Sequence, residues 1–174
     1  MKIESTAFTV ADLEAFLDEQ LDHERNVLAG RLEQASARLA ELGPRIKPGG
    51  GADGWSEHEV LAHIAVLSKF YGVLVHKVAT GQVAEVDLLS NTNLRDVAGE
   101  QMAAIEPGEL LRMTLADHAR TAKELRSLDP AALRLKVKVV GGGSFSDVSA
   151  EFLARYPLVN HLEEHVDQLQ RSLG

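Results

Sequence analysis

The sequence predicts an all-α protein, a four-helix bundle with one small β-element between the third and fourth helices. Four segments repeat apolar residues at spacings of three, four and seven, which is typical of helices that bury one face. Residues that start or stop helices flank these segments, and one short stretch alternates apolar and charged residues instead. A length of 174 residues fits one domain with its own core, so we expect a single domain over residues 1–174.

The first predicted helix covers residues 13–42. Thr9 with Asp12 forms an N-cap pattern before it, and Gly43 with Pro44 ends it. Its apolar positions repeat at helical spacing: Leu13, Leu17, Leu21, Leu28, Leu32 and Leu39.

The second predicted helix starts at Trp55 and Ser56, where Ser56 and Glu59 form a capping box, and runs to about residue 79. Gly81 marks its end. A polar stretch of more than twenty residues follows, up to Pro107, and residues 93–105 within it are compatible with a short helix.

The third predicted helix covers residues 108–128, with Pro107 in its first turn. Residues 133–140 alternate Leu and Val with Arg and Lys, which predicts a strand, and Phe145 with Ser146 is compatible with a returning strand of a hairpin. The last helix is expected over residues 147–173, with a kink near Leu153 because Pro157 lies inside it.

Composition excludes several classes of function. The chain has no cysteine, so disulfides, thiolate catalysis and cysteine-ligated metals are excluded. The net charge of −8 and the lack of a basic stripe argue against nucleic acid as a partner. No signal peptide and no apolar run of membrane-spanning length is visible, so we expect a cytoplasmic protein that acts on a small molecule and not at a membrane.

Three histidines carry the chemistry. His161 and His165 lie one turn apart on the apolar stripe of the last helix, and His63 lies on the apolar stripe of the second. A buried imidazole without a partner costs roughly 1–3 kcal/mol, so three inward-pointing rings on two helices are best explained by a shared ligand. Neutral imidazole binds zinc, nickel and iron, and helical bundles often hold metals between their helices. The sequence therefore predicts a divalent-metal site on His63, His161 and His165.

A plainer interpretation stays open, because histidines four residues apart also arise by chance and single core histidines are common. His118, on the stripe of the third helix, could be a fourth ligand, a substrate contact or a hydrogen-bonded core residue, and we favour the last. His58 and His76 are expected in solvent, and His23 half-buried. Glu163, Glu164 and Asp167 are expected on outer faces, so no catalytic acid or base is assigned.

At these residues the sequence resembles the DinB/YfiT-like superfamily of metalloenzymes. The resemblance rests on a W-S-x-x-E-V-L-A-H motif at residues 55–63 and an H-x-x-x-H-x-x-Q-L motif at residues 161–169, and it extends over essentially the whole chain. It implies an up-down-down-up four-helix bundle, a metal held by His63, His161 and His165, and dimers. The long connection before Pro107 suits this topology because it lets helices two and three run parallel.

Relatives in that superfamily include thiol S-transferases acting with bacillithiol or mycothiol, and the N-terminal domain of mycothiol-dependent maleylpyruvate isomerase. The chain departs from the isomerase type in showing no additional C-terminal domain, which argues against the isomerase assignment. We expect an open three-histidine site at which a low-molecular-weight thiol, bound as cosubstrate, attacks a small electrophile. Two alternatives remain: a metal-dependent hydrolase using metal-bound hydroxide, and a non-catalytic bundle that dimerises and keeps vestigial or structural histidines.

Overall fold

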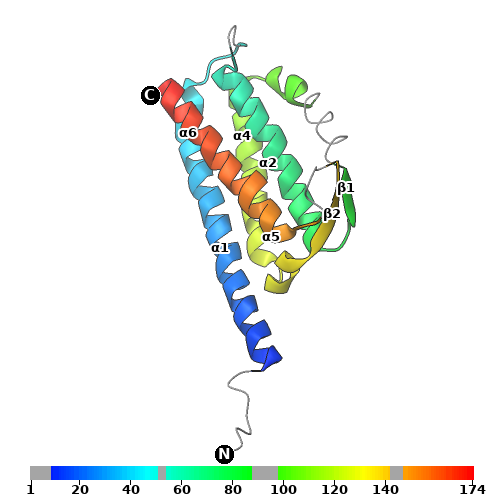
Figure 1. Ribbon diagram of the computed structural model, residues 1–174. Helices are drawn as coiled ribbons and strands as arrows, with labels where there is room; N and C mark the ends of the chain where they lie inside the picture. The colour runs from blue at the N-terminus through cyan, green and yellow to red at the C-terminus, as the bar shows by residue number, and fades with distance from the viewer. Residues whose placement is uncertain (1–8, 51–53, 88–97, 142–146) are drawn as a thin grey trace, which may run out of the picture.

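A computed structural model describes residues 9–50, 54–87, 98–141 and 147–174. Within them, four long helices pack side by side as the bundle that the sequence predicts (Figure 1). The main contacts join α1 to α4 and α6, and α2 to α4 and α6, so α1 and α2 occupy opposite corners. The four helices are α1 (Val10–Leu42), α2 (Glu57–Ala79), α4 (Pro107–Ser127) and α6 (His161–Leu173).

The direction of the helices confirms the up-down-down-up order. In Figure 1, α1 and α6 rise while α2 and α4 descend, so α2 and α4 run parallel to each other. The long connection between them makes this possible, and residues 98–103 within it are helical. This agrees in part with the short helix expected at residues 93–105, of which residues 93–97 lie outside the described part.

The helix ends follow the expected signals. Thr9 and Asp12 form a reciprocal capping box at the start of α1, and Ser56 and Glu59 form another at the start of α2. Gly81, after α2, has a φ of 68°, a conformation that favours glycine. Pro107 is the first residue of α4.

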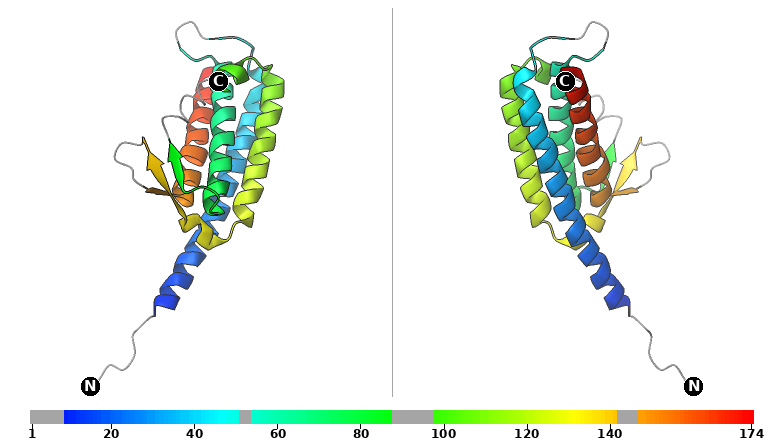
Figure 2. Two further views of the ribbon diagram at one scale, coloured as in Figure 1. Left: turned by 90° about the vertical axis from the view of Figure 1, so that its right-hand side faces the viewer. Right: turned by 90° about the vertical axis from the view of Figure 1, so that its left-hand side faces the viewer.

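A three-stranded sheet lies against one side of the bundle (Figure 2). The predicted strand is β2 (Lys136–Val140), and it pairs antiparallel with β3 (Asp147–Ser149) and parallel with β1 (Glu85–Asp87). Side chains alternate on β2, so that Val137 and Val139 are buried while their neighbours are exposed. The residues before it, Pro130–Arg134, form a 3₁₀ turn instead of extending the strand.

The last helix differs from the prediction at its start. Asp147–Ser149, expected in that helix, pairs with β2, and Phe145 and Ser146 lie outside the described residues. Helix α5 (Ala150–Leu153) then leads into a π-helical segment, Ala154–Asn160, which contains Pro157. The wider π turn accommodates a residue that cannot donate the normal helical hydrogen bond, and α6 resumes regular geometry at His161.

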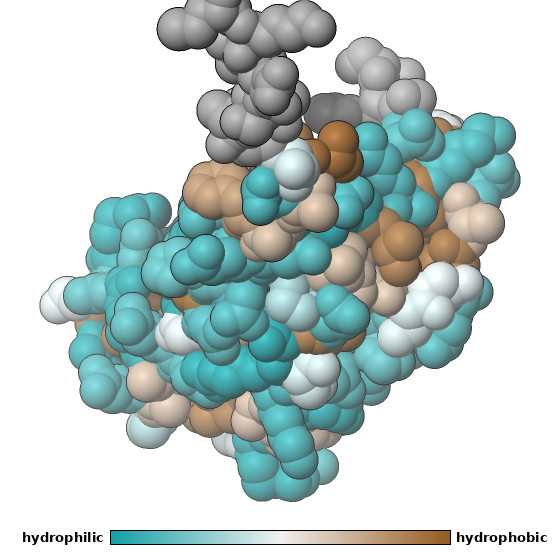
Figure 3. All heavy atoms as spheres, turned by 90° about the horizontal axis from the view of Figure 1, so that it is seen from below, coloured by the Kyte–Doolittle hydropathy of each residue, from teal (hydrophilic) through white to brown (hydrophobic). Residues whose placement is uncertain are grey.

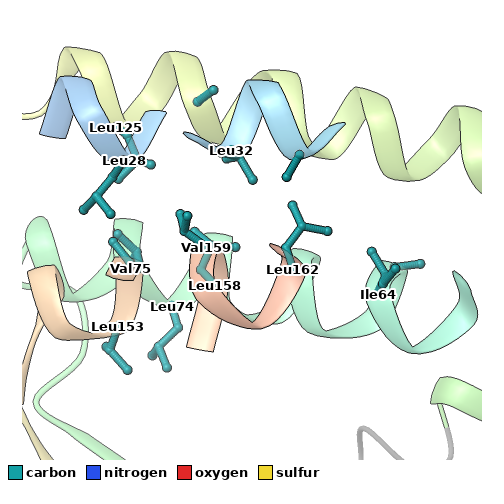
Figure 4. Packing of buried hydrophobic residues seen from close by; sticks show 14 of the residues in the cluster. Leu28, Leu32, Ile64, Leu74, Val75, Leu125, Leu153, Leu158, Val159 and Leu162 are labelled. Atoms are coloured by element: carbon teal, nitrogen blue, oxygen red, sulfur yellow. The ribbon is translucent and has the colours of Figure 1, made fainter. Parts of the chain in front are cut away.

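The core fills the space between the four helices. Leu28 and Leu32 of α1 point toward Val159 and Leu162 across the bundle interior (Figure 4). All four side chains are at most 1% exposed. Helix α2 is long and apolar enough to cross a membrane by composition, but 67% of that stretch is buried within the bundle, as in the core helix of a globular domain.

Candidate metal centre

The three predicted ligands meet between α2 and α6. His63 lies in the second turn of α2, while His161 and His165 occupy the first and second turns of α6. Because α2 and α6 are neighbours in the bundle, the three rings form one cluster, with each side chain half-buried.

The distances between their ring nitrogens suit one shared ion. Nε2 of His161 lies 3.4 Å from Nε2 of His63 and 3.1 Å from Nε2 of His165. Ligands at about 2.1 Å from a metal, separated by tetrahedral or right angles, lie about 3.0–3.4 Å apart. A single proton can bridge only one pair of these nitrogens at a time, whereas a divalent cation would bind all three. The donor set therefore fits a metal.

One neighbouring side chain sets the orientation of His165. Its Nδ1 lies 2.9 Å from Oε1 of Gln168, an acceptor, so the N–H is on Nδ1 and donates to that oxygen. The lone pair of Nε2 is then directed into the cluster. Partners of this kind, beyond the ligands themselves, fix the tautomer and ring angle in many histidine metal sites.

An indole ring borders the cluster. The ring centre of Trp55 lies 4.6 Å from that of His63 and 6.5 Å from that of His165. Trp55 remains 58% exposed, so it borders the site without closing it. Three histidines with an open side are the arrangement of a catalytic metal site, because coordination positions stay available for a substrate.

Two cavities adjoin the cluster. The first, of about 380 Å³, reaches His161 from the side of the sheet and is lined mainly by apolar side chains. The second, of about 600 Å³, reaches His63 and includes Trp55, Glu59 and Glu100. Because His161 lines the first cavity and His63 the second, a molecule in either one can approach the histidines, and Tyr71 lines both.

The acidic residues of α6 lie at the surface, as expected, and two of them form ion pairs with α1. Glu163 pairs with Arg31 of α1, and Asp167 pairs with Arg38 of the same helix, so both carboxylates contact a neighbouring helix. Glu164 is exposed as expected, yet it lines the cavity beside His161. The Glu163 and Asp167 side chains remain 31% and 50% exposed, so both lie at the surface, but the sequence did not predict their ion pairs with α1.

The other histidines lie apart from the cluster, and three of them differ from expectation. His58 is buried, not in solvent, with Nε2 2.8 Å from the carbonyl oxygen of Ile105. His76 is partly buried, and His23 is exposed, not half-buried. His118 is a core residue, with Nδ1 2.6 Å from Oγ of Ser36.

Sequence reasoning missed the apolar cavity and the positions of Trp55 and Gln168 relative to the histidines. The spacing of Gln168, three residues after His165, was a usable signal, because residues three apart on a helix are neighbours. The cavity had no such signal, since part of its wall comes from β1, which pairs with a strand fifty residues later.

Comparison with known proteins gives one family. The family model described as "Mycothiol maleylpyruvate isomerase N-terminal domain" matches residues 33–159, which include His63 and end just before His161. No curated protein and no solved structure matches the chain.

Proposed function

The chain belongs to the family of mycothiol maleylpyruvate isomerase N-terminal domains, within the DinB/YfiT-like superfamily, and from that premise we propose a metal-dependent transferase that joins a low-molecular-weight thiol to a small electrophile. The observation that carries the proposal is the convergence of three Nε2 atoms, at 3.4 and 3.1 Å, beside two cavities. His63, His161 and His165 would hold a divalent ion such as zinc, nickel or iron.

Such an ion would supply Lewis acidity, which would lower the pKa of the thiol cosubstrate. The protein's own residues provide the rest. Gln168 keeps the lone pair of His165 directed into the cluster, and the open side next to Trp55 leaves room for a thiol. The thiol proton passes to solvent, the sulfur electron pair forms the sulfur–carbon bond, and the leaving group departs with the pair of the bond that breaks.

The absence of cysteine is compatible with this chemistry, because the nucleophile arrives as a cosubstrate. Metal-assisted hydrolysis at the same site is the second candidate, and it shares the ligands and the open side. A non-catalytic bundle is the third. Binding of metal separates the third from the first two, and dependence on thiol separates the first from the second.

The first measurement is metal content by elemental analysis of protein purified without a histidine tag. We expect about one divalent ion per chain in the wild type, a loss of most of it in His165→Ala, and no loss in His23→Ala. His23 is a matched control because it is an exposed histidine on α1, away from the cluster. A stable wild type that binds no divalent metal overturns both enzyme proposals.

The second measurement follows product formation from chlorodinitrobenzene with mycothiol, bacillithiol and other small thiols. We expect release of chloride and formation of the thioether only when both thiol and metal are present, and turnover at background in His161→Ala. Metal-loaded protein that gives no thiol-dependent turnover with any of these thiols contradicts the transferase proposal and leaves hydrolysis as the better one.

A further inference from the structure

The cavity beside His161 has an apolar wall made by the sheet. Valines from all three strands point into it, and Tyr71, Phe152 and Tyr156 contribute rings. On β2 the alternation of side chains decides which valines take part: Val139 lines the cavity and is 8% exposed, while Val140 points away and is 36% exposed. The valines are Val86, Val137, Val139 and Val148.

The size of this cavity limits its ligand to a small molecule. Its volume is about 380 Å³, at the lower end of ordinary ligand pockets, and a cavity of about 150 Å³ is enough for benzene. One or two fused rings, or an alkyl chain of similar volume, would fill it. Burial of the ligand's apolar surface would supply the affinity. Polar side chains are few in the cavity wall except at the end where His161 and Asn160 lie.

The described lining of this cavity offers an anion no cationic side chain. Among the described residues that line this cavity none is lysine or arginine, and Glu164 is acidic. The second cavity is similar in this respect, since its charged lining residues are Glu59 and Glu100. In metal-free protein, a carboxylate entering the first cavity would lose its water without gaining a cationic side chain among these residues, which is unfavourable.

We propose that the cavity beside His161 binds the uncharged apolar body, of about one or two rings, of the molecule that reacts at the histidine cluster, and that without metal it binds a carboxylate of the same size more weakly. That the bound molecule reacts at the histidine cluster rests on the proposed function. Binding in the cavity is independent of it, because binding depends on the valine wall and can be measured in protein without metal.

The test uses metal-free, full-length protein and two probes with the same ring system, 2-naphthol and 2-naphthoate, titrated by calorimetry at pH 7. We expect 2-naphthol to saturate one site with a dissociation constant of about 0.1–1 mM, which a ligand of its size reaches at modest efficiency. We expect 2-naphthoate to bind at least fivefold more weakly, and Glu164→Gln to narrow that difference.

Matched variants on one strand locate the site. Val139→Phe puts a larger side chain into the cavity and should weaken 2-naphthol binding at least tenfold. Val140→Phe adds the same group one residue later, on the outer face, and should leave binding within twofold of the wild type. Because Val139→Phe could disturb folding, Tyr156→Ala provides a second variant; Tyr156 is 51% exposed, so its truncation spares the core while weakening binding severalfold.

Resonances of the histidine rings give an independent readout of position. In metal-free protein, 2-naphthol should shift the ring signals of His161 and leave those of His23 unchanged. Equal effects of the Val139 and Val140 substitutions, or tighter binding of 2-naphthoate, would overturn the proposal. Saturable binding that follows the predicted pattern in a protein without thiol-dependent turnover would keep the cavity assignment and reject the transferase proposal alone.

Discussion

His118 shows how burial alone changes the chemistry of a side chain. The residue is 2% exposed on the core face of α4, and its Nε2 has no hydrogen-bond partner among the described residues. Burial lowers the pKa of His118 to about 4, and the nearby charge of Asp117 opposes this only in part. The ring is therefore neutral at pH 7. Its burial and its hydrogen bond to Ser36 agree with the interpretation favoured from the sequence, a hydrogen-bonded core histidine.

The lowered pKa of His118 predicts a loss of stability in mild acid. Above the ordinary histidine pKa of about 6.5 the ring is neutral in both folded and unfolded chains. As the pH falls from about 6.5 to 4, the unfolded chain takes up a proton that the folded chain does not, so the free energy of unfolding decreases. Between pH 6.5 and 5 the contribution is about 2 kcal/mol.

Urea unfolding at pH 7 and pH 5, with a chelator present throughout, measures this contribution. We expect His118→Gln to lose about 2 kcal/mol less than the wild type over that interval, because glutamine does not titrate. The exposed His23→Gln control should lose as much as the wild type. The same pH dependence in all three proteins would show that His118 does not carry the effect.

At the scale of elements, one glycine sets the distance between α2 and α4. A Cβ at Gly72 would lie 2.6 Å from Oγ1 and 3.3 Å from Cγ2 of Thr121, which is closer than van der Waals contact allows. Thr121 is buried, so it has little room to move. Gly30 of α1 provides a contrast, because nothing lies within 4 Å of a Cβ placed there.

Alanine at these two helical glycines should therefore change stability in opposite directions. Gly72→Ala should lower the free energy of unfolding by about 1–2 kcal/mol, since overpacking outweighs the gain in helix propensity. Gly30→Ala should raise it by up to about 1 kcal/mol, because only the propensity changes. Chemical denaturation of both variants at pH 7 measures the difference. Stabilisation by Gly72→Ala would mean that α2 and α4 can separate at no cost.

The elements that sequence reasoning predicted well are those whose signals are local. The capping box at Ser56 and Glu59 fixed the start of α2, and alternation identified β2, because each pattern lies within a few residues. Strand β1 and the true start of the last helix were missed. Glu85–Asp87 and Asp147–Ser149 are strands because β2 pairs with both, and pairing between distant segments leaves no local pattern.

At the scale of the whole molecule, the three histidines of the candidate site could be predicted from the sequence, but the cavities beside them could not. The positions of His63, His161 and His165 on apolar stripes were enough to bring them together once α2 and α6 were neighbours. The walls of the cavity come from the sheet, the π segment around Pro157 and the second half of α2, which only the folded chain brings together. A single domain, a homodimer and a cytoplasmic location remain predictions.

The outer surface offers one feature that bears on assembly. The first turns of α1 extend beyond the end of the bundle (Figure 2), and exposed apolar side chains occur there, including Val10 and Phe16. Seen from below, apolar residues form small groups among hydrophilic ones (Figure 3). Light scattering across a range of concentrations would establish whether the protein dimerises.

Metal binding should stabilise the whole molecule, because the proposed ligands join segments 98 residues apart, on α2 and α6. An ion that binds only the folded chain raises the free energy of unfolding by about 2.7 kcal/mol at one hundred times its dissociation constant. For a chain of 174 residues this corresponds to a rise in Tm of about 5–10 °C. Thermal unfolding with zinc or nickel should show that rise in the wild type and in His23→Ala, and none in His165→Ala. A chelator should reverse it, and an equal rise in His165→Ala would mean that the ion binds elsewhere on the protein.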